Sequence, residues 1–139
     1  RRISDFGGLK KSMPIYAGIF LFTSFASIGL PGLNGFVGEF MILMGSFPTF
    51  NVLSSIAAFG VVLAAIYMLW AYQRMFNGEF THEDNKNLLD LNSKEIVSVA
   101  PLLILMLFIG LYPSFIESYV VQDVSIIYES INNTLGLSK

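Results

Sequence analysis

The sequence predicts an all-α fold, a polytopic bundle of transmembrane helices in which one helix is broken. Two observations lead to this prediction. Hydrophobic residues make up 54% of the 139 residues and charged residues only 13%, whereas a soluble domain carries about 25% charged residues. The apolar residues also gather in three long stretches, and a helix that crosses a bilayer needs about 20 of them. The mean hydropathy of +0.65 points the same way.

The first apolar stretch, residues 13–47, follows a polar segment at 1–12 and is interrupted in its middle. Pro31, Gly32 and Gly35 stand where an unbroken helix would continue, and such residues punctuate regular structure. Without the interruption this stretch would form a helix of roughly 52 Å at about 1.5 Å per residue, well beyond the thickness of a bilayer core. We therefore predict a broken transmembrane helix over 13–47.

The remaining elements are two plain spans, a loop and a tail. Apolar residues dominate 52–74 and 96–113, and both ranges are long enough to cross a bilayer. The polar residues of 75–95 between them predict an exposed loop. Apolar residues recur at loosely helical spacing in the tail, 114–139, so this segment is either an interfacial amphipathic helix or a frayed tail that packs on a neighbour.

Basic residues indicate how these spans are oriented, because Lys and Arg favour the cytoplasmic side of a membrane. If 13–47 crosses once and 52–74 crosses back, every basic residue except Lys139 faces the cytoplasm. If 13–47 crossed twice, the two basic groups would face opposite sides. One broken span is therefore expected, with 1–12 and 75–95 cytoplasmic and the tail external. The basic residues before the tail are Arg1, Arg2, Lys10, Lys11, Arg74, Lys86 and Lys94.

The candidate functional residue is Glu39, which follows the interruption with apolar residues on both sides. An ionisable group in the centre of a transmembrane helix costs about 2.5–3.5 kcal/mol on insertion scales, and it usually marks an ion or proton path. Broken helices recur at the ion sites of transporters. Glu39 is thus predicted to be a proton relay, the alternative being a carboxylate that reaches a membrane interface or makes a structural hydrogen bond. The predicted spans contain no basic partner for it.

Other residues around the interruption are candidates for lining the path or supporting the broken backbone: Ser24, Ser27, Pro31, Gly32, Asn34 and Gly35. Serine often bonds only the carbonyls of its own helix, and asparagine is common in ordinary turns, so structural roles compete with functional ones. Near the end of the second span, Tyr67, Trp70 and Tyr72 fit an aromatic belt at a membrane interface.

Several classes of protein are excluded. Without cysteine no disulfide framework or cysteine-based metal site is possible. One histidine and a net charge of −2 leave no nucleic-acid footprint. The acidic residues of the 75–95 loop match no metal-ligand template, and a solvated loop is expected there: Glu79, Glu83, Asp84 and Asp90.

The chain begins Arg1-Arg2-Ile3, and no signal-peptide pattern precedes the first span. Three spans alone bury little polar function. We therefore expect these residues to form the C-terminal part of a larger membrane protein, and we expect the broken helix to need the remainder for folding.

Five segments together resemble one family closely. They are GGLKKSMP (7–14), FTSFASIGLPGLNGFVGEFMILMGSF (22–47), AYQRMFNGEF (71–80), LLDLN-x-x-E (88–95) and FIGLYPSFI (108–116). The chain is similar to the C-terminal portion of the antiporter-like membrane subunits of respiratory complex I, NADH–quinone oxidoreductase, in the chain M branch. The resemblance covers nearly the whole chain, and the stretch around Glu39 is its most specific part. Several paralogues carry lysine where this chain has Glu39.

The resemblance implies an antiporter-like inverted-repeat fold and proton translocation coupled to quinone reduction, with Glu39 as the glutamate of the second broken helix. It implies that this chain holds no redox centre, and that NADH, FMN, iron–sulfur clusters and quinone belong to other subunits. The implied partners are the rest of the same subunit, neighbouring antiporter-like subunits and lipid. The implied location is the bacterial inner (plasma) membrane.

Three alternatives remain open from the sequence. The chain could belong to an Mrp-type cation/proton antiporter or to a membrane-bound hydrogenase. It could also be a membrane scaffold without transport, in which case Glu39 could be replaced by glutamine without loss of transport.

Overall fold

The computed structural model describes residues 3–135, and within them it contains helices and turns only, which confirms the predicted all-α class. Residues 136–139 of the predicted tail lie outside the described part of the chain. The elements are η1 (Ile3–Asp5), α1 (Leu9–Ser12), α2 (Pro14–Ser27), α3 (Asn34–Ser46), α4 (Asn51–Phe76), η2 (Glu83–Asn87), α5 (Ser93–Leu111) and α6 (Ser114–Leu135).

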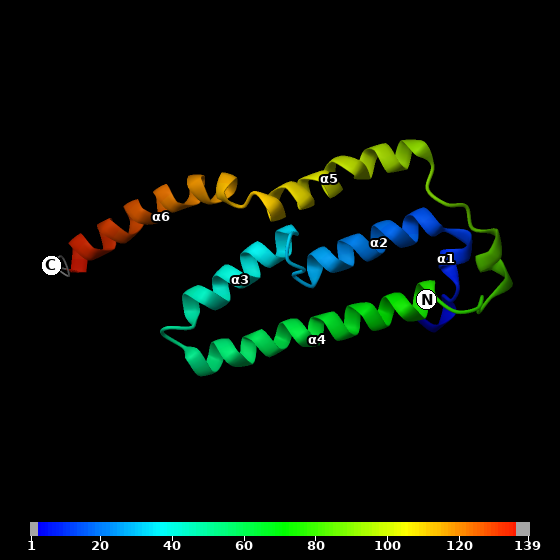
Figure 1. The fold of residues 1–139 in the computed structure, drawn as a ribbon, viewed down its shortest axis with the longest axis horizontal. Coiled ribbons are helices and arrows are strands. Elements are labelled where there is room, and N and C mark those ends of the chain that lie inside the picture. The colour runs from blue at the N-terminus through cyan, green and yellow to red at the C-terminus, as the bar shows by residue number, and fades with distance from the viewer. Residues whose placement is uncertain (1–2, 136–139) are drawn as a thin grey trace.

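Helices α2 and α3 follow one another end to end, and α4 runs back along both of them (Figure 1). α2 has 14 residues and α3 has 13, and their combined 27 helical residues are close to the 26 of α4. At about 1.5 Å per residue, α4 is roughly 39 Å long. Where α3 turns into α4, the hydroxyls of Ser46 and Ser54 lie 2.8 Å apart and share a hydrogen bond.

Two helices, α4 and α5, are long and apolar enough to cross a membrane by length and composition. Their large apolar side chains are mostly exposed; in α4 these include Ile56, Phe59 and Leu63. Soluble monomers rarely expose apolar surface over such lengths. The outer faces of these helices are therefore suited to lipid or to neighbouring transmembrane helices rather than to water.

A small aromatic core joins α2 to the end of α4. Phe76 is completely buried, Tyr72 is 7% exposed, and their rings stack 4.9 Å apart. Phe20 of α2 packs against both rings. Tyr72 thus belongs to this core, not to the interface belt that its position suggested, whereas Tyr67 and Trp70 are 60% and 51% exposed.

The segment before α2 packs on the loop after α4. The backbone N–H of Gly8 donates to the carbonyl of Asn77 at 3.2 Å. The buried side chain of Asn85 donates from Nδ2 to the carbonyl of Asp5 at 3.1 Å. The two polar segments therefore lie at the same end of the helices, where Figure 1 shows α1 beside the loop.

Asp90 ties this loop to the start of α2. Met13, the residue before the helix, makes no side-chain cap, and Pro14 has no N–H to satisfy. The next two backbone N–H groups, of Ile15 and Tyr16, donate to the two carboxylate oxygens of Asp90 at 2.7 and 3.0 Å. A carboxylate at this end of a helix also interacts favourably with the helix dipole. Asp90 is therefore an N-cap contributed from a distant part of the sequence.

The α5 and α6 helices complete the chain. Just before α5, the backbone N–H of Asn92 donates to the carboxylate of Glu95 at 2.8 Å, as in a capping box. α5 packs against α3. After Pro113, α6 extends away from the other helices, and its side chains are largely exposed (Figure 1). The tail is thus a helix over Ser114–Leu135.

The cap predicts a defined loss of stability. Asp90→Ala removes both hydrogen bonds, and we expect the free energy of unfolding to fall by about 0.5–2 kcal/mol at neutral pH. Asp90→Asn, which keeps an acceptor without the charge, should lose less. Thermal unfolding, in detergent, of the membrane protein that contains this chain measures both. Asp84 is an exposed carboxylate of the same loop, so Asp84→Ala is the matched control and should have little effect.

The same cap predicts a pH dependence. Partial burial raises the pKa of Asp90, but the N–H groups of Ile15, Leu91 and Tyr16 outweigh it and hold the pKa below its ordinary value. A lowered folded pKa means that the stabilisation is complete above the unfolded pKa and is lost as the pH falls through the folded pKa. The stability gap between wild type and Asp90→Ala should therefore close in acid. An unchanged gap in acid would contradict this account.

Candidate functional site

The site lies at the interruption between α2 and α3, residues 28–33, which we call the break. α2 closes with two bonds: the N–H of Leu30 donates to the carbonyl of Phe25 at 3.0 Å, and that of Gly29 donates to the carbonyl of Ala26 at 3.4 Å. These are the two bonds of a Schellman motif, whose C′ residue needs a positive φ. Gly29 supplies it with a φ of 77°. The helix therefore stops because a glycine allows the chain to turn back on its carbonyls.

A second turn brings the chain to α3. The N–H of Leu33 donates to the carbonyl of Leu30 at 3.1 Å, with Pro31 and Gly32 at the two central positions. Gly32 has a φ of 94°. Proline followed by a glycine of positive φ is the pattern of a type II turn. Pro31 and Gly32, two of the predicted support residues, thus shape the break through their backbone.

The start of α3 packs closely on the end of α2. A Cβ added to Gly35 would overlap the carbonyl oxygen of Ala26, so only glycine allows this approach. Beside it, Oδ1 of Asn34 is buried and has no hydrogen-bond partner among the described residues. A buried acceptor of this kind normally has a donor, from protein or from ordered water.

Glu39 lies on α3 and reaches back to the break. Helical side chains lean toward the N-terminus of their helix, which points Glu39 toward Gly29. A Cβ on Gly29 would overlap Oε2 of Glu39 and would lie 3.1 Å from its Cδ. The carboxylate is thus in contact with the backbone of the break. It makes no ion pair with any described residue, and the ion pair that is present, Lys86–Glu83 at 2.6 Å, belongs to the loop.

The α5 helix covers the break from another side. A Cβ on Gly110 would overlap the carbonyl oxygen of Gly32 and the Cα of Leu33, and its three nearest neighbours are all backbone atoms of Gly32 and Leu33. Small residues allow transmembrane helices to approach at this distance. The turn of the break therefore rests directly on the backbone of α5.

A cleft of about 260 Å³ opens next to the break between α3, α5 and α6. Its walls are mostly apolar, and Asn34 and Glu117 contribute polar atoms. It is lined by Asn34, Val37, Gly38, Met41, Ile109, Pro113, Ile116, Glu117 and Val120.

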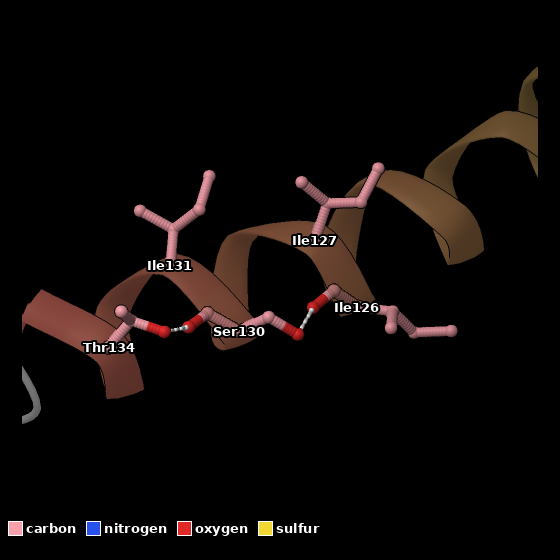
Figure 2. A pocket seen from close by; sticks show the side chains of 5 residues that line it. All are labelled: Ile126, Ile127, Ser130, Ile131 and Thr134. Carbon is pink, nitrogen blue, oxygen red and sulfur yellow. Dashed lines mark hydrogen bonds between the residues drawn. The ribbon is translucent and has the colours of Figure 1, made fainter.

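A larger hollow of about 430 Å³ lies on α6 alone and is a poor candidate for chemistry (Figure 2). Ile127 and Ile131 project from the same side of the helix. The hydroxyls of Ser130 and Thr134 donate to carbonyls of their own helix, at 2.8 Å each. This hollow is an apolar helix face.

Neither serine candidate is seen to contact the break as Glu39 does. Ser24 is 2% exposed, and its hydroxyl donates to the carbonyl of Phe20 at 2.7 Å. Thr23 likewise bonds carbonyls of its own helix. Ser27 ends α2 and is exposed. Glu39 and Gly35 thus both lie against Gly29. Pro31 and Gly32 form the second turn and Asn34 begins α3, whereas Ser24 bonds within α2.

Sequence reasoning missed three residues that shape the site or its supports. Gly29 and Gly110 looked like ordinary glycines of an apolar chain, because their close contacts join different helices. Asp90 was placed in a solvated loop. Its adjacency to the α5 capping box could have suggested a structural role, but nothing in the sequence places it at α2. Among residues 3–135, no group of three or more His, Asp or Glu side chains could hold a metal ion.

Comparison with known proteins gives consistent results. The NADH:quinone oxidoreductase/Mrp antiporter transmembrane family matches residues 1–64. NADH-quinone oxidoreductase subunit M of Rhodobacter capsulatus is 39% identical over 136 residues, 98% of this chain and 27% of the relative. The subunit M proteins of Mycobacterium tuberculosis and Rickettsia felis are 42% and 40% identical, over 81% and 84% of this chain and 20% and 24% of the relatives.

A solved structure agrees with the sequence comparisons. A chain of respiratory complex I from Thermus thermophilus with bound NADH is 34% identical, with a TM-score of 0.73 over 82% of this chain and 24% of that chain. The present chain thus spans about a quarter of the length of these relatives. It is a membrane protein, and its sequence and fold are similar to those of the membrane subunits of the NADH:quinone oxidoreductase/Mrp antiporter family.

The contact between α5 and the break predicts the effect of a single methyl group. Alanine normally favours a helix over glycine by about 1 kcal/mol. In Gly110→Ala the methyl would meet backbone atoms that cannot rotate away, so we expect a net loss of about 1–3 kcal/mol. Gly60→Ala in α4, where a Cβ meets nothing within 4 Å, should not lower stability. Thermal unfolding of the membrane protein that contains this chain measures both. Equal stability of the two variants would disprove the close packing.

Proposed function

We propose that this chain is the C-terminal part of a proton-translocating subunit of NADH–quinone oxidoreductase and that Glu39 is a proton relay within it. The observation that carries the proposal is the contact between the Glu39 carboxylate and the broken backbone. In hydrocarbon, irregular backbone survives where protein buries it or where it lines a wet cavity. An ionisable side chain at such a place has a means of exchanging protons that an intact apolar helix does not offer.

The chemistry required of Glu39 is a reversible protonation. Taking up a proton makes the carboxyl neutral and suited to apolar surroundings. Releasing it restores a negative charge. The buried Oδ1 of Asn34 has no hydrogen-bond partner among the described residues, and such an acceptor normally bonds ordered water or another protein group, which supports a hydrated or partnered site. A basic partner for Glu39 would likewise come from the rest of the subunit.

A membrane topology accompanies this proposal. Residues 13–47 form one discontinuous transmembrane helix, 52–74 and 96–113 form two further spans, 1–12 and 75–95 are cytoplasmic, and 114–139 is external. It is supported by the contacts that hold the two polar segments at one end of the helices, through Asn77, Asn85 and Asp90. Both segments carry the basic residues that favour the cytoplasmic side.

The proposed partners follow from the family and from the exposed surfaces. The remainder of the subunit, neighbouring antiporter-like subunits and lipid would cover the apolar faces, including that of α6 with Ile127 and Ile131. NADH, FMN, iron–sulfur clusters and quinone would be bound by other subunits. The chain would then be part of a redox-driven translocase without a redox centre of its own, in a bacterial inner membrane.

Glu39→Gln tests the relay in the assembled complex. The amide keeps the size of the side chain but cannot carry a proton, so we expect proton pumping in closed vesicles and coupled NADH–quinone turnover to fall severely, with assembly preserved. Glu129→Gln, an exposed carboxylate on α6, is the matched control. Wild-type pumping by Glu39→Gln would favour the scaffold alternative.

The family name also covers Mrp antiporters, and the same vesicles distinguish the two activities. Sodium-dependent proton transport without NADH or quinone would assign the chain to a secondary antiporter.

A further inference from the structure

Gly29 has a second contact besides the bonds that end α2, and this contact involves the proposed relay. Its Cα faces the end of the Glu39 side chain: an added Cβ would overlap Oε2 and would lie 3.1 Å from Cδ and 3.6 Å from Oε1. No other described glycine has a carboxylate among its nearest atoms. The missing side chain of Gly29 thus leaves the space that the carboxylate occupies.

The local geometry explains why these two groups meet. The positive φ of Gly29 turns the chain at the end of α2. Gly35 lets the first turn of α3 approach Ala26. A Cβ added to Gly35 would lie 3.7 Å from the Cα of Gly29, so these two glycines are also neighbours. Glu39 follows Gly35 by one helical turn and leans toward it. Its carboxylate is therefore carried over the first turn of α3 to the break.

We propose that Gly29 is a positioning residue for the Glu39 carboxylate. Its bare Cα lets the carboxylate lie against the broken backbone, where the proton path would run, and any side chain at residue 29 would push the carboxylate aside. This inference rests on the proposed relay function of Glu39. Because the nearest atoms belong to the flexible end of a side chain, a substitution would move the carboxylate rather than the helices.

Backbone strain is the competing explanation for an effect at residue 29, and Gly32 provides the control for it. Both glycines lie in the break with positive φ, 77° and 94°, so alanine is strained at either position. A Cβ on Gly32, however, meets only Cδ2 of Leu111 at 3.9 Å, an ordinary contact. Gly32→Ala therefore reproduces the strain without displacing Glu39.

The experiment compares Gly29→Ala and Gly32→Ala in the complete complex, each alone and combined with Glu39→Asp. Assembly and protons pumped per NADH oxidised are measured in closed vesicles. We expect Gly29→Ala to pump fewer protons per NADH than Gly32→Ala. Aspartate is one methylene shorter and leaves room for the new methyl, so Glu39→Asp should partly restore pumping to Gly29→Ala and should not improve Gly32→Ala.

The outcomes separate this inference from the proposed function. Equal pumping by the two alanine variants, or no restoration by Glu39→Asp, overturns the positioning role, whereas an unaffected Glu39→Gln variant overturns the relay itself. If Gly29→Ala fails to assemble, assembly becomes the readout. Recovery of assembly on adding Glu39→Asp supports the contact between the two side chains, and absence of recovery overturns it.

Discussion

The need to satisfy a broken backbone within an apolar bundle governs this structure. Two consecutive turns meet that need at the break: the Schellman bonds from Gly29 and Leu30 to α2, and the bond from Leu33 to Leu30. Each turn requires a residue with positive φ, and glycine occupies both positions. In hydrocarbon an unpaired peptide group costs several kcal/mol. The sequence GLPGLNG therefore ends one helix and begins another while pairing the backbone groups of both turns.

Glycines also determine how the break is enclosed. Gly35 admits the carbonyl of Ala26, Gly110 admits the backbone of Gly32 and Leu33, and Gly29 admits a carboxylate. Three helices thus approach one turn at distances that alanine would prevent. Because the neighbours of Gly35 and Gly110 are backbone atoms, these contacts are rigid, whereas the neighbour of Gly29 is a side chain that can rotate. The enclosure is stiff around the turn and adaptable at Glu39.

The helical class could be predicted from the sequence because apolar runs act through local rules. The interruption between α2 and α3 coincides with the Pro31-Gly32 pair that suggested it, whereas a broken helix that spans the membrane stays a prediction. Glu39 stood out because charge in an apolar segment is costly. Contacts between distant residues left no such signal. Asp90 looked like one of several solvated acids although it caps α2, and Tyr72 looked like a belt residue although α2 buries it. The relay role of Glu39, the support role of the serines and the membrane topology remain predictions.

The cap by Asp90 has a mechanical consequence for the break. Asp90 holds the first turn of α2 and lies just ahead of α5, whose far end, through Gly110, bears on the turn that follows α2. The segment before α5 therefore contacts the start of α2, and the end of α5 contacts the turn that follows α2, a helix of roughly 21 Å for 14 residues. Because α3 also packs on α5, and Gly35 and Gly110 contact backbone atoms, the helices around the break are held in place and the Glu39 side chain is the part that can move.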